Sequence, residues 1–305
     1  MGWFDHGASI VTLRMTALPR RISPWIAIVV AILWLGPLRA ASGDAATAEG
    51  IQLPPRSRVA DLVPAEQIEQ RAALQYQQMR ENAASQRALA PEGHPKLLRL
   101  QAIAKRLLPH AGRYNERAPQ WRWEVSLIGS QALNAFAMPG GKIAFYTGII
   151  ERLQLSDDEI AFVMGHEIAH ALREHGRERQ GKAMIAQGLS IGASVLSQVL
   201  GYGDLGGQVA RGVSNVTMLK FSRDDESEAD LLGMDLSARA GFNPAAGISL
   251  WEKMAAASSG QGAPPQWLST HPSHDSRIAD IRKALPKVQP LYERARIEQG
   301  KPGSR

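Results

Sequence analysis

Residues 163–176, VMGHEIAHALREHG, decide the fold, because two histidines and a glutamate stand inside an apolar helical pattern. Apolar residues recur every four positions, as on one buried face of a helix: Ile160, Met164, Ile168 and Leu172. Ser156 with Glu159 three residues later is typical of the capping box that begins a helix. We expect this helix to end at Gly176, since glycine favours the left-handed conformation that closes many helices.

The polar groups of this helix have the spacing of a metal site. Side chains four residues apart lie on one face of a helix, so His166 and His170 point together and can share one small cation. Glu167 lies beside that cation, where its carboxylate can accept a proton from metal-bound water. This is the H-E-x-x-H pattern of zinc proteases, in which zinc lowers the pKa of its bound water to about 7. A pair of solvated histidines beside a surface glutamate is the alternative, which the apolar helix disfavours.

A third ligand must come from histidine or a carboxylate, because the chain has no cysteine. The absence of cysteine also excludes disulfides, thiolate metal sites and a cysteine nucleophile. Residues 222–230, SRDDESEAD, offer Glu226 and Glu228, between which spacing alone does not choose. Asp230 lies one turn after Glu226 and is suited to accept the N–H of a ligating histidine, His166. An exposed acidic start of a helix is the alternative interpretation.

Three motifs in order, HEIAH, ESEAD and THPSHDSRI, resemble metallopeptidase family forty-eight, of the gluzincin type, over about residues 90–285. The family includes the HtpX heat-shock proteases, the CAAX prenyl endopeptidases and the periplasmic members BepA and LoiP. The glycine-rich segment NAFAMPGGKIAFYTG is also similar to the family. The resemblance implies one zinc ion per chain, with Glu226 as the third ligand and Glu228 as a spacer.

The same resemblance draws attention to His271, which follows Thr270 in the third motif. Two roles are open for it: a donor to the transition-state oxyanion, or a fourth ligand that displaces water and holds the enzyme latent. Arg277 is expected either to orient a substrate carbonyl or to cap the loop. His175 and His274 are interpreted as ordinary loop histidines. Gluzincins bind an extended peptide along a strand edge, and the residues expected there are Asn134, Ala135, Phe136, Ala137 and Met138.

The expected fold class is α+β, mostly α: a gluzincin zinc-metalloprotease domain with a small β-sheet or hairpin beside the H-E-x-x-H helix. Alternating apolar and polar residues predict a half-buried strand over 121–129, and NAFAM, Pro139-Gly140-Gly141 and KIAFYTG predict a hairpin. Further helices are predicted over 64–89, 95–108, 222–240, 244–257 and up to about 285, with two more within 177–221.

We divide the 305 residues into a signal peptide at 1–41, a flexible polar leader and N-terminal helix at 42–90, a metallopeptidase domain at 91–286 and a polar tail at 287–305. Residues 177–221 are expected to form a helical lid or arm. Their apolar side chains are interpreted as core rather than as a surface for a partner, although both remain open. The chain is interpreted as a compact stand-alone member of the family.

The first residues have the order of a secretory signal: arginines, the apolar run WIAIVVAILWLG at 25–36, and then small residues. Twelve apolar residues are few for a membrane span, which needs about 20, so we expect cleavage near 40–46 and a periplasmic location. An inner-membrane anchor through residues 25–36 is the alternative. The formal net charge of +6 is mild and half of it lies in the first 40 residues, which argues against a nucleic-acid partner.

These observations predict a periplasmic zinc endopeptidase of a Gram-negative bacterium. Its expected substrates are misfolded or stalled envelope proteins, and the outer-membrane assembly machinery is a candidate partner. The alternative is a latent, chaperone-like binder of outer-membrane proteins in which His271 caps the zinc site. Glu167 argues against an inactive protein, since a pure binder does not need a general base.

Overall fold

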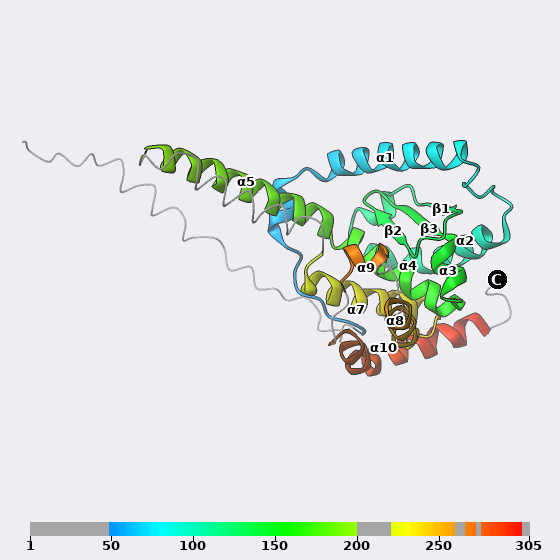
Figure 1. Cartoon of the computed structure of the whole chain (residues 1–305). Coiled ribbons are helices and arrows are strands. Elements are labelled where there is room, and N and C mark those ends of the chain that lie inside the picture. The colour runs from blue at the N-terminus through cyan, green and yellow to red at the C-terminus, as the bar shows by residue number, and fades with distance from the viewer. Residues whose placement is uncertain (1–48, 200–220, 260–265, 273–275, 301–305) are drawn as a thin grey trace, which may run out of the picture. The chain divides into compact units, whose positions relative to one another are not determined.

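The computed structural model describes residues 49–199, 221–259, 266–272 and 276–300 (Figure 1), all within the unit that spans residues 47–305. The predicted signal peptide at 1–41, with its alternative anchor at 25–36, lies outside the described residues, as does His274. Among the helices that are described, none is long and apolar enough to cross a membrane.

The sheet has three strands: β1 (Glu124–Ile128), β2 (Ala135–Met138) and β3 (Lys142–Tyr146), in the order β1-β3-β2. β2 and β3 are antiparallel and form the predicted hairpin, and β1 runs parallel to β3. Gly140 and Gly141 adopt φ of +80° and +84° in the turn, a conformation that glycine accepts readily. A Cβ at Gly141 would also lie 2.9 Å from the Trp123 ring.

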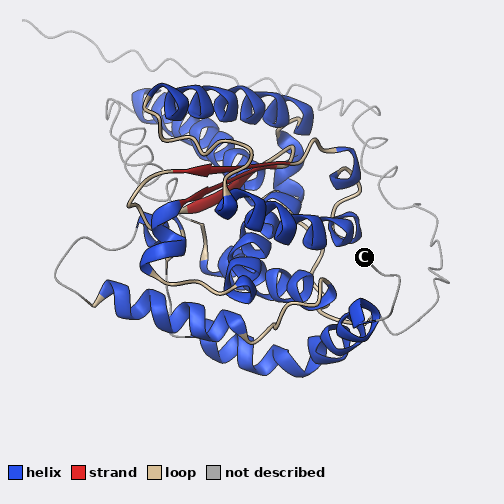
Figure 2. Cartoon of the chain, turned by 90° about the vertical axis from the view of Figure 1, so that its right-hand side faces the viewer, coloured by secondary structure: helices blue, strands red, loops and turns tan. Residues whose placement is uncertain are grey.

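Helices make up most of the chain, and Figure 2 shows how small the sheet is beside them. The α-helices are α1 (Ala65–Ser85), α2 (Pro95–Leu107), α3 (Thr147–Arg152), α4 (Asp157–Leu172), α5 (His175–Val199), α7 (Arg223–Arg239), α8 (Ala246–Ser258), α9 (Gln266–Thr270) and α10 (Ser276–Gly300). Short 3-10 helices are η2 (Arg58–Leu62), η3 (Leu108–Arg113) and η4 (Ala118–Gln120). The predicted fold class, α+β and mostly α with a small sheet, is confirmed.

The two faces of the sheet are covered by different helices. On one face lies α1, whose Tyr76 hydroxyl contacts the Ser126 hydroxyl at 2.8 Å and donates to the carbonyl of Ile143 at 2.9 Å. The opposite face packs its apolar side chains into the main core with α2 and α4. In Figure 1 the strands accordingly lie between α1 and α4. Ser126, predicted on the polar side of its strand, is buried because α1 covers that side.

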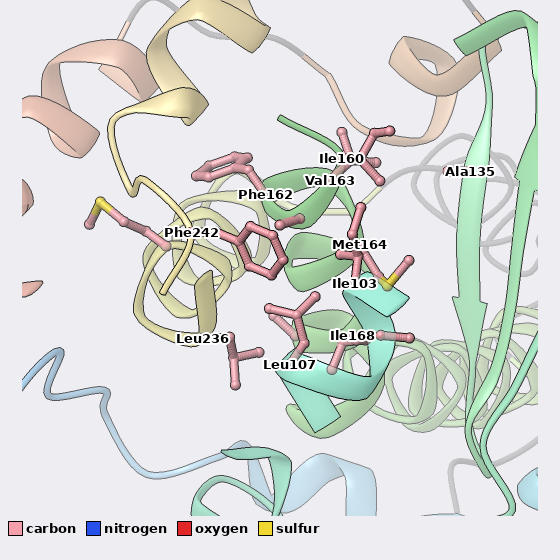
Figure 3. Close-up of a cluster of buried hydrophobic side chains, with 14 of the residues drawn as sticks. Ile103, Leu107, Ala135, Ile160, Phe162, Val163, Met164, Ile168, Leu236 and Phe242 are labelled. Carbon is pink, nitrogen blue, oxygen red and sulfur yellow. The ribbon is translucent and has the colours of Figure 1, made fainter. Parts of the chain in front are cut away.

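α4 begins at the predicted capping box, in which Ser156 accepts from the backbone of Glu159 and the Glu159 carboxylate accepts from the backbone of Ser156. Its burial goes beyond the predicted stripe, since every residue from Glu159 to Leu172 is buried. Figure 3 shows apolar side chains of α4 among residues from α2 and α7 and from the loop after α7. Any polar group on this helix therefore has to find its partner inside the protein.

Two predicted helix ends are wrong. α4 ends at Leu172, and the left-handed residue is Glu174 (φ 59°), whereas Gly176 lies inside α5. The Glu174 carboxylate is buried and paired with Arg177 at 2.5 Å, which helps to hold this unfavourable conformation. At the other end of the chain, α10 continues through Pro286 and Pro290 to Gly300, so the predicted tail is helical up to residue 300. Burial of its apolar face outweighs the local cost of the two prolines.

Two expectations about peripheral segments also need correction. The leader was expected to be flexible, but Ile51 is buried and its backbone N–H donates to Asp235 of α7 at 2.8 Å. In the predicted arm, α5 accounts for residues up to 199, and residues 200–220 lie outside the described part. Met184 and Ile185 were interpreted as core, yet they are 54% and 44% exposed. The apolar side chains of the arm from Leu189 onward are not among those described.

α4 and α7 cross at two glycines, and this crossing brings the polar residues of both helices together. A Cβ at Gly233 would lie 2.7 Å from the backbone nitrogen of His166, and a Cβ at Gly165 would lie 2.9 Å from the carbonyl oxygen of Gly233. These are backbone atoms, which cannot move aside as a flexible side chain can. Only residues without a side chain allow this approach.

We expect Gly233→Ala to destabilise the fold by about 1–3 kcal/mol, the usual cost of overpacking, and to weaken metal binding, because the helices must separate. Gly188→Ala is the matched control, since a Cβ at Gly188 in α5 meets nothing within 4 Å. Urea unfolding and zinc titration of both variants measure the effect. Equal stability of the two variants would contradict the proposed role of the crossing.

Candidate metal centre

Three segments bring four candidate ligands together in the core. α4 carries His166 and His170, the first turn of α7 carries Glu226, and His271 follows α9 directly. One ligand atom from each residue lies within 4.8 Å of all the others, and all four side chains are buried. The resemblance to the family implied the first three as ligands, and the structure places them in one cluster.

The spacing within this cluster fits a tetrahedral zinc ion. Ligand atoms about 2.0–2.1 Å from zinc lie roughly 3.3 Å from one another in a tetrahedron. The Nε2 atoms of His166 and His170 are 3.1 Å apart, and Nδ1 of His271 is 3.3 Å from Nε2 of His166. The Glu226 carboxylate lies 3.0 Å from Nδ1 of His271 and 3.5 Å from Nε2 of His170.

The hydrogen bonds behind the ligands also suit a bound cation. Nδ1 of His166 lies 3.0 Å from the Asp230 carboxylate, as the sequence predicted, and donates its proton to it. Its Nε2 therefore presents a lone pair to the centre of the cluster. Burial, followed by the charges of its neighbours, lowers the pKa of His170 well below its usual range, so this imidazole is neutral. Converging lone pairs repel one another unless a positive ion lies between them.

Arg277 is committed to two carboxylates and not to the substrate. Its guanidinium donates to Asp230 at 2.6 and 2.7 Å and to Glu226 at 2.7 Å, and it is 1% exposed. Its predicted role in orienting a substrate carbonyl is therefore wrong, whereas a contact with the loop is seen at the Pro272 carbonyl, 3.4 Å away. Burial alone would raise the pKa of Asp230, but Arg277 and His166 outweigh burial and lower it to about 2.

His175 is a buried partner of His170, which corrects its interpretation as an ordinary loop residue. The Nδ1 atoms of the two histidines are 2.9 Å apart, and Nε2 of His175 lies 2.8 Å from Glu228. One proton arrangement satisfies both contacts: His170 donates to His175, and His175 donates to Glu228. Glu228 is in turn paired with Arg173 at 2.7 Å, so it is more than a spacer. The left-handed Glu174 turns the chain so that His175 faces back toward His170.

Glu167, the predicted general base, is buried and already has partners. The indole N–H of Trp267 donates to its carboxylate at 2.5 Å, and Nε2 of His271 lies 3.5 Å from the same oxygen. Sequence reasoning missed Trp267, although it stands four residues before His271, the spacing of one helical face. One short helix, α9, thus covers the base and leads into the fourth candidate ligand. This geometry fits the fourth-ligand role of His271, and the oxyanion role stays a prediction.

β2 is an outer strand, but only alternate residues of the predicted edge present their backbone there. The Asn134 carbonyl accepts from Tyr146 and the Met138 carbonyl accepts from Gly141, so both face the hairpin. By alternation, Ala135 and Ala137 direct their N–H and C=O groups outward. No strand pairs with this edge among the described residues. The Leu133 carbonyl, also on the outer side, accepts from the backbone N–H of Trp267 at 3.0 Å. Asn134, Phe136 and Met138 therefore turn their backbone groups toward β3, and substrate binding along this outer strand stays a prediction.

Comparison with known proteins gives one family and several named relatives. The model of Peptidase family M48 matches residues 96–285. The chain is 34% identical over 202 residues to the mitochondrial metalloendopeptidase OMA1 of Schizosaccharomyces pombe, which covers 66% of this chain and 56% of that protein. It is 28% identical over 199 residues to the beta-barrel assembly-enhancing protease of Escherichia coli, which covers 63% and 39%. The chain spans less than two thirds of the length of each of these relatives.

We expect His175→Phe to lower zinc affinity by about 10–100-fold, the usual effect of losing a hydrogen bond behind a ligand. His175→Asn should lose less zinc affinity than His175→Phe, because the asparagine side-chain oxygen can take the place of Nδ1 and accept the hydrogen bond from His170. Competition with a zinc-binding dye measures the affinity. If both variants bind zinc as the wild type does, His175 does not orient His170.

Proposed function

Because the chain belongs to peptidase family M48, we propose that it hydrolyses internal peptide bonds of misfolded or stalled envelope proteins, with Glu167 as the general base. Membership in the family confirms the predicted class of enzyme, a zinc metallopeptidase, and the predicted cofactor, zinc. The observation that carries the proposal is the buried cluster of His166, His170 and Glu226 with Glu167 beside it.

Each residue of the cluster has a defined task in this proposal. His166, His170 and Glu226 would hold the zinc ion, with Asp230 and Arg277 fixing the first and third of them through the contacts described above. When bound, zinc polarises the scissile carbonyl and makes water acidic enough to attack at neutral pH. Glu167 accepts the proton of the attacking water and returns it to the leaving amine.

The outer edge of β2 supports binding of extended, unfolded chains. Ala135 is buried, but Ala137 is partly exposed, and its outward N–H and C=O groups can pair with a peptide backbone whatever its side chains. Such pairing suits a protease that acts on many misfolded proteins, because backbone atoms are common to all of them. The edge lies beside α4, which carries the base.

The proposal also includes a cellular location, a class of substrate and a partner. The relatives from Escherichia coli and Yersinia pestis are named beta-barrel assembly-enhancing proteases, which supports envelope proteins as substrates and the outer-membrane assembly machinery as a partner. Residues 1–41 have the pattern of a secretory signal, which supports a periplasmic location. Other relatives, from Schizosaccharomyces pombe and Saccharomyces cerevisiae, are named mitochondrial metalloendopeptidases.

A second candidate function is a latent binder of outer-membrane proteins. The observation in its favour is that His271 occupies the fourth corner of the ligand cluster while Trp267 holds Glu167. A protein in this state would bind unfolded chains at β2 without cutting them. Removal of the His271 imidazole separates the two functions.

The decisive experiment is cleavage of casein by the purified protein with zinc bound. We expect chelator-sensitive cleavage that falls by about 10²–10⁴-fold in Glu167→Gln, the usual contribution of a general base, while zinc remains bound. If only His271→Ala cuts, the histidine holds the wild type latent. If no variant cuts although zinc is bound, the peptidase proposal fails and the binder is favoured.

The proposed edge can be tested by removing one outward N–H. Ala137→Pro should raise KM for casein by about tenfold, since a lost hydrogen bond is worth about 1 kcal/mol or slightly more. Proline is accepted on outer strands where its nitrogen faces away from the neighbouring strand. Zinc content should stay at one ion per chain. An unchanged KM would place the substrate elsewhere.

A further inference from the structure

A pocket of about 210 Å³ lies beside His170. Its walls come from α1, from the end of β2 and the turn after it, from α4 and α5, and from Phe221 just before α7. Nothing in the reaction described above uses this space. It has room for one amino-acid side chain and shares His170 with the metal centre.

One part of the pocket lining is apolar or aromatic. The Phe221 ring stacks on the His170 imidazole with centroids 4.0 Å apart. Small or apolar side chains also line it, Ile68, Ala72, Ala137, Met138 and Ala171, together with the polar side chains of Gln75 and Gln180. An aliphatic stem can therefore lie here without leaving a polar group unsatisfied.

Two arginines, Arg71 and Arg179, line the same pocket. Cζ of Arg179 lies 4.6 Å from the centre of the Phe221 ring, and the side chain is half-buried. Arg71, on α1, is exposed at the other side. Within the part of the chain that the structure describes, neither makes an ion pair. By contrast, Arg173, Arg177 and Arg277, which lie nearby in the fold, are all paired with carboxylates.

We propose that this pocket is a specificity subsite that takes an acidic side chain, glutamate or aspartate, of the bound polypeptide. The inference rests on the proposed function and names its substrate preference. The stem would lie on Phe221 and Met138, and the carboxylate would accept hydrogen bonds from Arg179 and Arg71. A guanidinium presents its donors in a fork that matches a carboxylate.

The position of the subsite along the substrate follows from His170. The scissile carbonyl has to reach the metal held by this residue, and an extended chain advances about 3.3 Å per residue. The pocket touches the same imidazole. Its occupant therefore belongs to a residue within about two positions of the scissile bond.

The test measures binding separately from cleavage. Zinc-loaded protein with Glu167→Gln and His271→Ala is titrated with fluorescent decapeptides of alanine, serine and threonine that carry one Glu, Gln or Leu. Because the background is uniform, a peptide can slide until this one residue meets the pocket. We expect the Glu peptide to bind about tenfold or more tightly than the Gln peptide, as a charge-assisted hydrogen bond predicts.

Variants then assign the preference to the pocket. Arg179→Met should reduce the Glu preference to within about twofold, whereas Arg296→Met removes an equal charge on α10 and should keep it. Gly176→Leu should weaken binding of the Glu peptide by about tenfold by filling the pocket, since Gly176 lines it and a Cβ there meets nothing within 4 Å. Gly188→Leu, also with open space around its Cβ, is the control on the same helix.

Three outcomes would overturn the subsite: equal binding of the Glu and Gln peptides, tighter binding of the Leu peptide, or no binding of any peptide. A Glu preference that survives Arg179→Met would also overturn it. Failure of the wild type and of His271→Ala to cleave casein would instead contradict the peptidase function. The subsite would then describe a binder of acidic segments.

Discussion

The close approach of α4 and α7 at Gly165 and Gly233 is the constraint on which the metal centre depends. α4 carries His166, His170 and Glu167, the proposed base, and α7 carries Glu226 and Asp230. The distance between the helices therefore sets the size of the cluster. The backbones approach so closely that one added methyl group would meet backbone atoms. The geometry of the site is thus set by the packing of main chains, which is far stiffer than side-chain rotamers.

Burial of so many ionisable groups is stable only because their charges alternate in space. Arg277 lies between Glu226 and Asp230, Asp230 accepts from His166, and Glu228 lies between His175 and Arg173. Each carboxylate has a positive or donating neighbour, which lowers the cost of removing it from water. The imidazole nitrogens and the Glu226 carboxylate converge at one point, where a cation would complete the network.

The local parts of this structure could be predicted from the sequence, and the long-range parts could not. The spacing of His166, Glu167 and His170, the capping box at Ser156 and the glycine turn of the hairpin are encoded within a few residues each. The partners of the site are not local: Trp267 is 100 residues from Glu167, and His175 is 53 residues from Glu228. Glu174 shows the limit most clearly: its left-handed backbone is accompanied by a local ion pair with Arg177 and a long-range one with Arg56 at 3.3 Å, while the glycine two residues later is helical.

α9 has only five residues, yet it contacts three different parts of the site. The backbone N–H of Trp267 binds the edge beside β2, its indole binds Glu167, and the next turn delivers His271 to the ligand cluster. The edge, Glu167 and the ligand cluster are therefore linked through one short helix. A shift of this single turn of helix would change the access of a substrate to all three of them together.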